Sequence, residues 1–307
     1  MTKTAKHQNL VTLNEVLAEA ERGGYAVGSF SPRYTPMIAA VMRAGETAKS
    51  PLIVQISSRE LGLYDISPAE FAEEFYRVLE DEEISSPVVL HLDHTKEFDT
   101  IKAAIHAGFT SVMVDASHEH LDDNIAITRK VVEYAHPKGV SVEAELGRIG
   151  TTDFVETDTD EELFTVPEEA RRFVEETEVD ALAISVGTAH GVYMVRQPRV
   201  DYERVKAIRA LTDVHLVLHG GSGVPSEMIR KAIQCPGGGI SKVNIATDLE
   251  VAFLESIGRS ERLTNDACCN LAPDLLRTGQ KAVENVVVDK IMHFLGSGAK
   301  ANTGNLR

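Results

Sequence analysis

Three histidines of this chain each follow a short apolar run: His94, His190 and His219. If the runs are parallel strands, their carboxyl ends meet at one side of the fold, and the side chains placed there converge. Converging imidazole nitrogens can hold a divalent ion with open positions for substrate, as in a catalytic zinc site. A lone histidine at a strand end is more often only hydrogen-bonded, but three at matching positions favour a metal. Acidic residues at the same strand ends support this prediction, namely Asp93, Asp115, Glu143 and Glu145.

Glu143 and Glu145 are two residues apart on one predicted strand, so both face the same side of it. An inward carboxylate pair is costly unless cations or protons compensate it. We therefore expect one of the two to serve the metal region. The remaining histidines that we considered lack such convergence, and we interpret them as structural: His91, His106, His118, His120, His136 and His215.

A glycine-rich segment, Gly220-Gly221-Ser222-Gly223, follows the seventh apolar run and leads into a predicted helix at Ser226. Unencumbered backbone N–H groups and a helix N-terminus both favour a phosphate. The eighth run ends in Asn244-Ile245-Ala246-Thr247, again just before a helix. Glycine clusters are usually only turns, but their placement here predicts a phosphate on the substrate.

A divalent metal beside a phosphate site and a carboxylate suits proton abstraction or carbon–carbon cleavage next to a carbonyl, because the ion stabilises the enediolate that forms. Hydrolysis by a metal-bound water is the competing chemistry.

The elements that position these residues are eight apolar runs, rich in Val and Ile and without strict alternation, which is typical of parallel strands buried on both faces. Eight such units in roughly 250 residues are typical of a TIM (β/α)8 barrel. We expect one domain over 1–307, with a helical C-terminal extension at Leu275–Leu295 and a flexible tail from about residue 297. Helices are predicted at Ser67–Leu79, at Pro167–Thr177 and from Thr35-Pro36, with Thr35 as N-cap. The strands are predicted at Tyr25–Phe30, Pro51–Ser57, Pro87–His91, Ser111–Asp115, Ser141–Glu145, Ala181–Val186, His215–His219 and Ile240–Ile245.

Composition narrows the class of protein. The chain has 307 residues and a formal net charge of −16, with 31 Lys and Arg against 47 Asp and Glu. Such an acidic chain is not expected to bind nucleic acid or anionic membranes. No apolar run approaches the ~20 residues that span a bilayer, and the N-terminus lacks a signal-peptide core, so we expect a cytoplasmic protein. The three cysteines form neither a disulfide framework nor a metal-binding CxxC pair.

Six segments, HLDH, MVDAS, SVEAELG, VGTAHGVY, LVLHGGSG and KVNIATDL, occur in an order and spacing that resemble the zinc-dependent class II fructose-bisphosphate and tagatose-bisphosphate aldolases. The resemblance covers about Val11 to Lys300. It implies that His94, His190 and His219 hold the catalytic zinc and that Asp93 moves the proton to and from the aldehyde oxygen. It further implies a role for Asp115 and Glu145 at a second or displaced metal. The residues matching those that grip dihydroxyacetone phosphate are Ser57, Gly191, Gly220, Gly221, Ser222, Asn244, Ile245, Ala246 and Thr247.

The departures from the family pattern fall on the aldehyde side. NIATDLE replaces the NIDTDLR of fructose-bisphosphate enzymes, with Ala246 as in tagatose-type enzymes. Glu250 stands where many relatives have a basic residue that reads the distal phosphate, and a carboxylate would repel that phosphate. Ser31 replaces a substrate-side asparagine. The loop that carries a catalytic glutamate in the family offers only Asp153 here.

Arg33 and Arg59, with Asp153, are our candidate readers of the distal end of a nonstandard substrate; solvated loop arginines are the equally weighted alternative. The leading hypothesis is a zinc-dependent aldolase cleaving a ketose 1-phosphate or 1,6-bisphosphate to dihydroxyacetone phosphate and an aldehyde. A metal-dependent hydrolase and a noncatalytic metal-binding paralogue are the alternatives. The resemblance implies a homodimer or homotetramer; whether a monovalent cation assists stays open.

Overall fold

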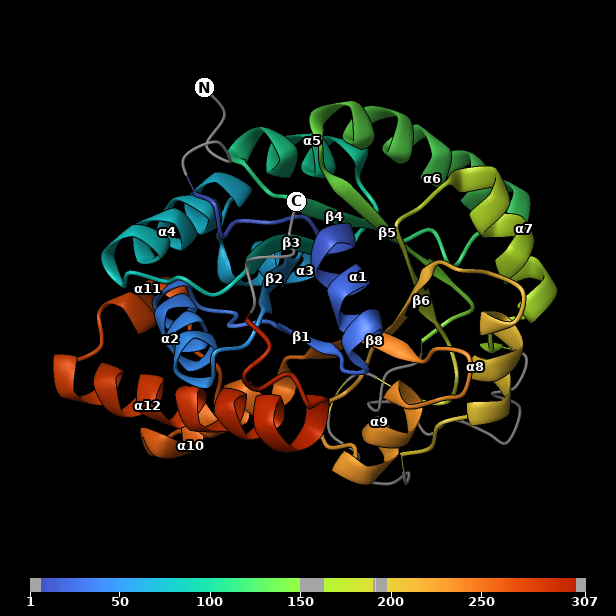
Figure 1. The fold of residues 1–307 in the computed structure, drawn as a ribbon. Helices are drawn as coiled ribbons and strands as arrows, with labels where there is room; N and C mark the ends of the chain where they lie inside the picture. The colour runs from blue at the N-terminus through green and yellow to red at the C-terminus, as the bar shows by residue number, and fades with distance from the viewer. Residues whose placement is uncertain (1–6, 150–162, 190, 192–197, 302–307) are drawn as a thin grey trace.

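The structure is a computed structural model that describes residues 7–149, 163–189, 191 and 198–301. Its strands form a closed barrel in which each is parallel to the next, from β1 round to β8 and back to β1 (Figure 1). The TIM-barrel prediction is therefore confirmed. The strands are β1 (Val27–Phe30), β2 (Leu52–Ser57), β3 (Val88–Thr95), β4 (Ser111–Val114), β5 (Ser141–Leu146), β6 (Ala181–Ile184), β7 (His215–Leu218) and β8 (Ile240–Ile245).

Helices surround the barrel, and α1 lies across the end of the barrel that faces the viewer in Figure 1. Leu13 and Leu17 of α1 are buried against the interior of that end, with Val27 and Val217 in the same apolar cluster. This end is therefore closed by packing. The helices are α1 (Leu13–Gly23), α2 (Ile38–Ala48), α3 (Ser58–Tyr64), α4 (Pro68–Asp81), α5 (Phe98–Ala107), α6 (Leu121–Ala135), α7 (Pro167–Thr177), α8 (Tyr202–Arg209), α9 (Ser226–Ile233), α10 (Thr247–Ser256), α11 (Asn265–Cys269) and α12 (Pro273–Asp289), with the short turns η2 (Thr35–Met37), η3 (His136–Lys138) and η5 (Lys290–Leu295).

The predicted strands all exist; the eighth has the predicted bounds, Ile240–Ile245, and the other seven have shifted ends. The largest shift is in β3, which runs to Thr95 and not to His91, because the polar residues that end the apolar run keep their backbone pairing with β2 and β4. The first strand begins at Val27 and the sixth ends at Ile184. Apolar character thus located the strands, but backbone hydrogen bonds set where they end.

The predicted N-cap at Thr35 is wrong. Thr35 begins a 3₁₀ turn, and the α-helix starts at Ile38. The Thr35 N–H and hydroxyl both donate to Asn265 Oδ1, at 2.9 and 3.1 Å, so Thr35 is held by the first residue of α11. The helix predicted from Ser67 begins as expected, because Ser67 caps α4 and accepts from the Glu70 N–H.

The C-terminal extension is helical as expected, but it is divided into α12 and the π-helical η5. Residues 297–301, where the flexible tail was expected to begin, pack against the barrel. The N–H of Ala299 donates to Ala48 O at 2.9 Å, and the N–H of Ala301 donates to Lys49 O at 2.8 Å. The Ser50 hydroxyl is buried against that of Ser297 at 2.8 Å.

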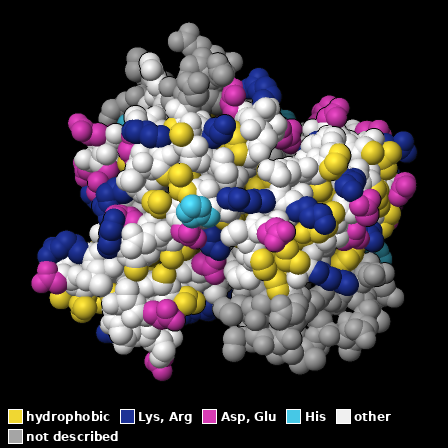
Figure 2. Space-filling view, turned by 60° about the horizontal axis from the view of Figure 1, so that its bottom comes forward, with side chains coloured by type: hydrophobic (Ala, Val, Ile, Leu, Met, Phe, Trp, Pro, Cys, Tyr) yellow, Lys and Arg dark blue, Asp and Glu magenta, His cyan; other side chains and the backbone are white. Residues whose placement is uncertain are grey.

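On the face shown in Figure 2, acidic and basic side chains are interspersed. Several ion pairs join neighbours along one helix, as Arg77 does with Glu74 and Asp81 on α4. Among the described helices, none is both long and apolar enough to cross a membrane.

Candidate active site

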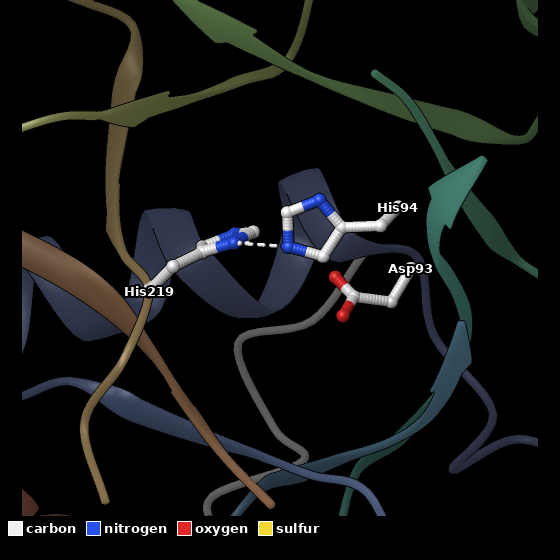
Figure 3. Close-up of side chains that lie close together, drawn as sticks. All are labelled: Asp93, His94 and His219. Carbon is white, nitrogen blue, oxygen red and sulfur yellow. Dashed lines mark hydrogen bonds between the residues drawn. The ribbon is translucent and has the colours of Figure 1, made fainter. Parts of the chain in front are cut away.

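β3 presents two adjacent candidate residues, Asp93 and His94, at its carboxyl end (Figure 3). Adjacent residues of a regular strand face opposite sides. Relative to β4, however, β3 contains an extra residue between Leu92 and Thr95, and such a bulge re-aims side chains. His94 has a positive φ of 29° at this bulge. The irregularity lets both side chains approach the same point.

His219 follows β7 and meets His94 from the other side of that point, as Figure 3 shows. His219 Nδ1 lies 2.8 Å from His94 Nε2, and the rings meet edge to face. The second nitrogen of each ring faces a carboxylate: His94 Nδ1 is 2.9 Å from Asp115 Oδ2, and His219 Nε2 is 2.9 Å from Glu143 Oε1. Carboxylates placed behind imidazoles in this way are typical of histidines that bind metals.

Three groups of described side chains have the geometry to hold a metal ion in this region: two contain His94, and the third consists of His91, Asp93 and Glu143. Ligand atoms of Asp93, His94 and His219 lie within 4.8 Å of one another, and so do those of His94, Asp115 and Glu145. Two imidazole nitrogens with a carboxylate form a donor set that suits zinc and similar transition metals. The residues therefore fit such an ion. His190, the third predicted ligand, lies outside the described residues.

Three carboxylates control the charge of His94. Burial works against a charged imidazole, but Asp93, Asp115 and Glu145 outweigh it. Together they raise the pKa of His94 to about 10. Burial raises the pKa of Glu145 to about 8. Despite burial, hydrogen bonds from His94 and Ser117 hold the pKa of Asp115 well below its usual range. This region therefore attracts one positive charge, either a proton on His94 or a metal ion in its place.

Asp93 is oriented by two amides. Asn244 Nδ2 donates to Asp93 Oδ1 at 3.1 Å, and Gln55 Nε2 donates to Asp93 Oδ2 at 3.2 Å. The Ser29 hydroxyl donates to Gln55 Oε1, so the amide nitrogen of Gln55 is turned toward Asp93. Gln55 was not among the predicted site residues. Its signal was a lone polar residue inside the apolar second run.

His91 also lies in this region, and the interpretation that it lacks convergence is wrong. Residue 91 faces the barrel interior as residue 93 does, and His91 Nε2 lies 3.8 Å from Asp93 Oδ1 and 3.6 Å from Glu143 Oε2. Burial and the charge of Lys242 hold the pKa of His91 well below its usual range. Lys242 Nζ is 2.7 Å from Glu143 Oε2, and this fixed cation opposes a metal between His91 and Glu143.

The loops after β7 and β8 are bonded together. The Gly221 N–H donates to Asn244 O at 3.0 Å, and the Ser222 hydroxyl accepts from the N–H groups of Ala246 and Asp248 at 3.3 Å each. The structure thus joins the two predicted phosphate segments into one surface at the start of α10. Its predicted members are Gly220, Gly221, Ser222, Asn244, Ile245, Ala246 and Thr247.

Glycine is required in this surface. A Cβ on Gly220, whose φ is +68°, would lie 2.3 Å from Ala189 O. A Cβ on Gly221 would lie 2.8 Å from Asn244 O. Gly191, the remaining predicted glycine, also has a positive φ of 109°. Backbone approaches this close leave no room for a side chain.

Ser57 lies at the end of β2, directly beside Asp93 in the strand register. Its hydroxyl accepts from the Glu60 N–H at 3.2 Å and donates to Glu60 Oε2 at 3.0 Å. Ser57 thus caps α3 in this structure. Its predicted contact with phosphate would have to share that hydroxyl.

A family model described as fructose-bisphosphate aldolase class-II matches residues 11–300 of this chain. This chain belongs to that family. The fructose-bisphosphate aldolase of Geobacillus stearothermophilus is 39% identical over 298 residues, which cover 95% of this chain and 99% of the relative. The fructose-bisphosphate aldolase of Helicobacter pylori strain J99 is 36% identical over 314 residues, which cover 95% of this chain and 99% of the relative. The crystal structure of the YdjI aldolase from Escherichia coli K12 matches with a TM-score of 0.78 and 31% identity, covering 95% of this chain and 100% of that one.

Membership of this aldolase family makes the chain a carbon–carbon lyase of carbohydrate metabolism, as the sequence predicted. It does not favour the hydrolase or the noncatalytic metal-binding protein. The backbone of the YdjI aldolase can be superimposed on this chain over the whole length of that aldolase.

A second polar cluster lies near the loop after β1, α3 and α10, and it contains Glu250, one of the departures from the family pattern. Glu250 is buried, and its Oε1 accepts from the hydroxyls of Tyr34 and Tyr64 at 3.2 and 3.0 Å. Its Oε2 accepts from Arg33 and, at 3.1 Å, from Arg262 Nε. We call Arg33, Glu60, Glu250 and Arg262 the arginine–glutamate cluster.

Arg33 is 9% exposed, so the alternative of a solvated loop arginine is wrong for this residue. Its Nε lies 3.1 Å from Glu60 Oε1 in addition to its contact with Glu250. Its φ of 61° shows that the loop after β1 turns sharply to place it there. Arg59, by contrast, is exposed. Asp153 lies outside the described residues.

Proposed function

We propose that this chain is a zinc-dependent aldolase that reversibly cleaves a ketose 1-phosphate or ketose 1,6-bisphosphate to dihydroxyacetone phosphate and an aldehyde. The supporting observation is the convergence of His94 Nε2 and His219 Nδ1 beside the Asp93 carboxylate. Zinc bound there would polarise the carbonyl and hydroxyl oxygens of the substrate. His94, His190 and His219 would hold it, with Asp115 and Glu145 able to serve a second divalent ion.

Asp93 would carry the proton to and from the aldehyde oxygen. The amides of Gln55 and Asn244 hold its carboxylate in place and leave it 5% exposed. A carboxylate held by neutral donors keeps its orientation while its proton comes and goes. The joined loops after β7 and β8 would hold the donor phosphate through Ser222 and backbone N–H groups.

For the distal end of the substrate, we propose that the 1-phosphate class is favoured over a bisphosphate. Arg33 is already paired with Glu60 and Glu250, so its charge is neutralised before any substrate arrives. Arg59 is then the remaining candidate reader of a distal anionic group. We expect Arg59→Ala to change the ratio of kcat/KM between ketose 1-phosphates and tagatose or fructose 1,6-bisphosphate.

The first experiment is metal-dependent exchange of the C3 proton of dihydroxyacetone phosphate with deuterated water, because it requires no knowledge of the aldehyde. We expect exchange by zinc-loaded protein, loss after chelation and recovery on adding zinc. His94→Ala should abolish both exchange and zinc binding. His136→Ala is the matched control, because His136 is a half-exposed histidine paired with Asp180. Zinc-loaded protein that binds dihydroxyacetone phosphate without exchanging its proton would overturn the proposal.

We also propose a homodimer or homotetramer located in the cytoplasm. Val251, Leu275 and Met292 of the C-terminal elements are large apolar residues that remain exposed. Sedimentation equilibrium of the full chain should give a mass of two or four copies. A monomer at micromolar concentration would contradict this.

A further inference from the structure

A lysine lies in the middle of the barrel, beneath the candidate metal position. Lys242 of β8 is fully buried, and so is its partner Glu143 of β5. The distance from Lys242 Nζ to Glu143 Oε2 is 2.7 Å. Strands β6 and β7 separate β8 from β5 in the sheet, so the pair crosses the barrel interior. Buried ion pairs recover their desolvation cost only with good geometry and further hydrogen bonds.

Glu143 also has a hydrogen bond to His219, one of the proposed metal ligands. Glu143 Oε2 faces Lys242, which turns Glu143 Oε1 toward His219 Nε2 at 2.9 Å. With Nε2 facing that carboxylate, His219 directs Nδ1 toward His94 Nε2. The rotation of one carboxylate therefore determines which nitrogen of His219 points at the metal.

We propose that Lys242 is a positioning residue for the metal: it holds the Glu143 carboxylate in the orientation that aims His219 Nδ1 at the candidate ion. Lys242 touches neither ligand nitrogen, and its effect passes through Glu143. The inference rests on the proposed zinc site at His94 and His219. A lysine that only stabilised the barrel would lower stability without changing the metal.

The main test is Lys242→Met, which keeps most of the side-chain volume and removes the cation. We expect a 10- to 100-fold rise in the zinc Kd, roughly the effect of losing a partner that orients a metal ligand. The Kd is measured by chelator competition. The visible absorption of the Co²⁺-substituted protein should change in shape, because the geometry around the ion changes. Lys242→Arg, which keeps the charge, should restore the affinity at least in part.

Arg209→Met is the matched control. Arg209 is 7% exposed on its side chain and pairs with Glu21 of α1 at 3.1 Å, an ion pair between two helices that contains no candidate metal ligand. This variant should lower the stability and leave the zinc Kd and the Co²⁺ spectrum unchanged. If both methionine variants change the metal equally, Lys242 has no specific role and the proposal is overturned.

Removing one partner of a buried pair can prevent folding. The double variant Glu143→Gln with Lys242→Met removes both charges and keeps a side chain that can accept from His219. Its amide is not held by a cation, so we expect the zinc Kd to stay raised. Wild-type zinc affinity in either folded variant, with an unchanged Co²⁺ spectrum, would overturn the proposal. Failure of the wild-type protein to bind zinc would instead refute the proposed function.

Discussion

Two clusters of charged side chains with buried members lie at the carboxyl end of this barrel, and they differ in how their charges are compensated. In the arginine–glutamate cluster, Arg33 and Arg262 face Glu60 and Glu250, and all the pairs lie within 3.1 Å. Around His94, three carboxylates share one imidazole, which needs an added proton or metal ion to balance them. Burial of charge alone therefore does not mark a reactive site. Among the described residues, the distinguishing feature of the site around His94 is that no Lys or Arg pairs with its carboxylates, Asp93, Asp115 and Glu145.

Among the substitutions that compare the two clusters, the largest expected effect is on turnover, at Asp93. Asp93→Asn should lower kcat by about 10²- to 10⁴-fold, because the amide cannot accept and return the substrate proton. Zinc content, measured by mass spectrometry, should fall far less than in His94→Ala, since both imidazoles, His94 and His219, remain. Asp180→Asn, at a surface pair with His136, is the control and should keep full activity. Wild-type turnover by Asp93→Asn would remove this residue from the mechanism.

Substitutions in the arginine–glutamate cluster should have a smaller effect, and this effect should be on the stability of the fold. Glu250→Gln leaves Arg33 and Arg262 without this carboxylate, so the free energy of unfolding should fall by about 3 kcal/mol. Urea denaturation of the metal-free protein measures it. Glu284→Gln, which breaks the pair with the partly exposed Arg43, should cost less than about 1 kcal/mol. The zinc Kd should be unchanged in both variants. A shift in the zinc Kd on replacing Glu250 would show that the two clusters are coupled.

The smallest effect concerns pH. The folded pKa of Glu145 is raised to about 8 and that of His94 to about 10, so the metal-free folded state holds protons that the unfolded chain has released. Stability from Glu145 is fully present below its unfolded pKa and is lost as pH rises through about 8. That from His94 is lost as pH rises through about 10.

The melting temperature of the metal-free protein should therefore fall from pH 6 to pH 10, by about 3 °C for a loss of roughly 2 kcal/mol. Zinc replaces the proton on the ligand nitrogen, so the loaded protein should show a flatter profile. Equal slopes for the two forms, followed by scanning calorimetry, would count against a metal at His94.

Much of the fold was predictable because the signals are local. Each strand coincides with an apolar run, and Ser67 and Pro68 start α4 as capping chemistry requires. Among the described residues, the predicted site residues His94, Asp115, Glu145 and His219 also lie at strand ends, as the barrel topology demands. The start of the helix after Thr35 was not predicted correctly, because Thr35 is bonded to Asn265, a residue distant in the sequence.

Residue types in chain order were enough to predict the barrel, the family and the strand ends where the candidate site lies. The tertiary structure alone decided which groups compensate one another. Lys242 stands inside an apolar run, 99 residues from Glu143, and only barrel closure brings their charges to 2.7 Å. Arg33 and Glu250 are 217 residues apart, yet they form one buried pair. Electrostatic energy depends on distance in space and on burial, and neither can be read from positions along the chain.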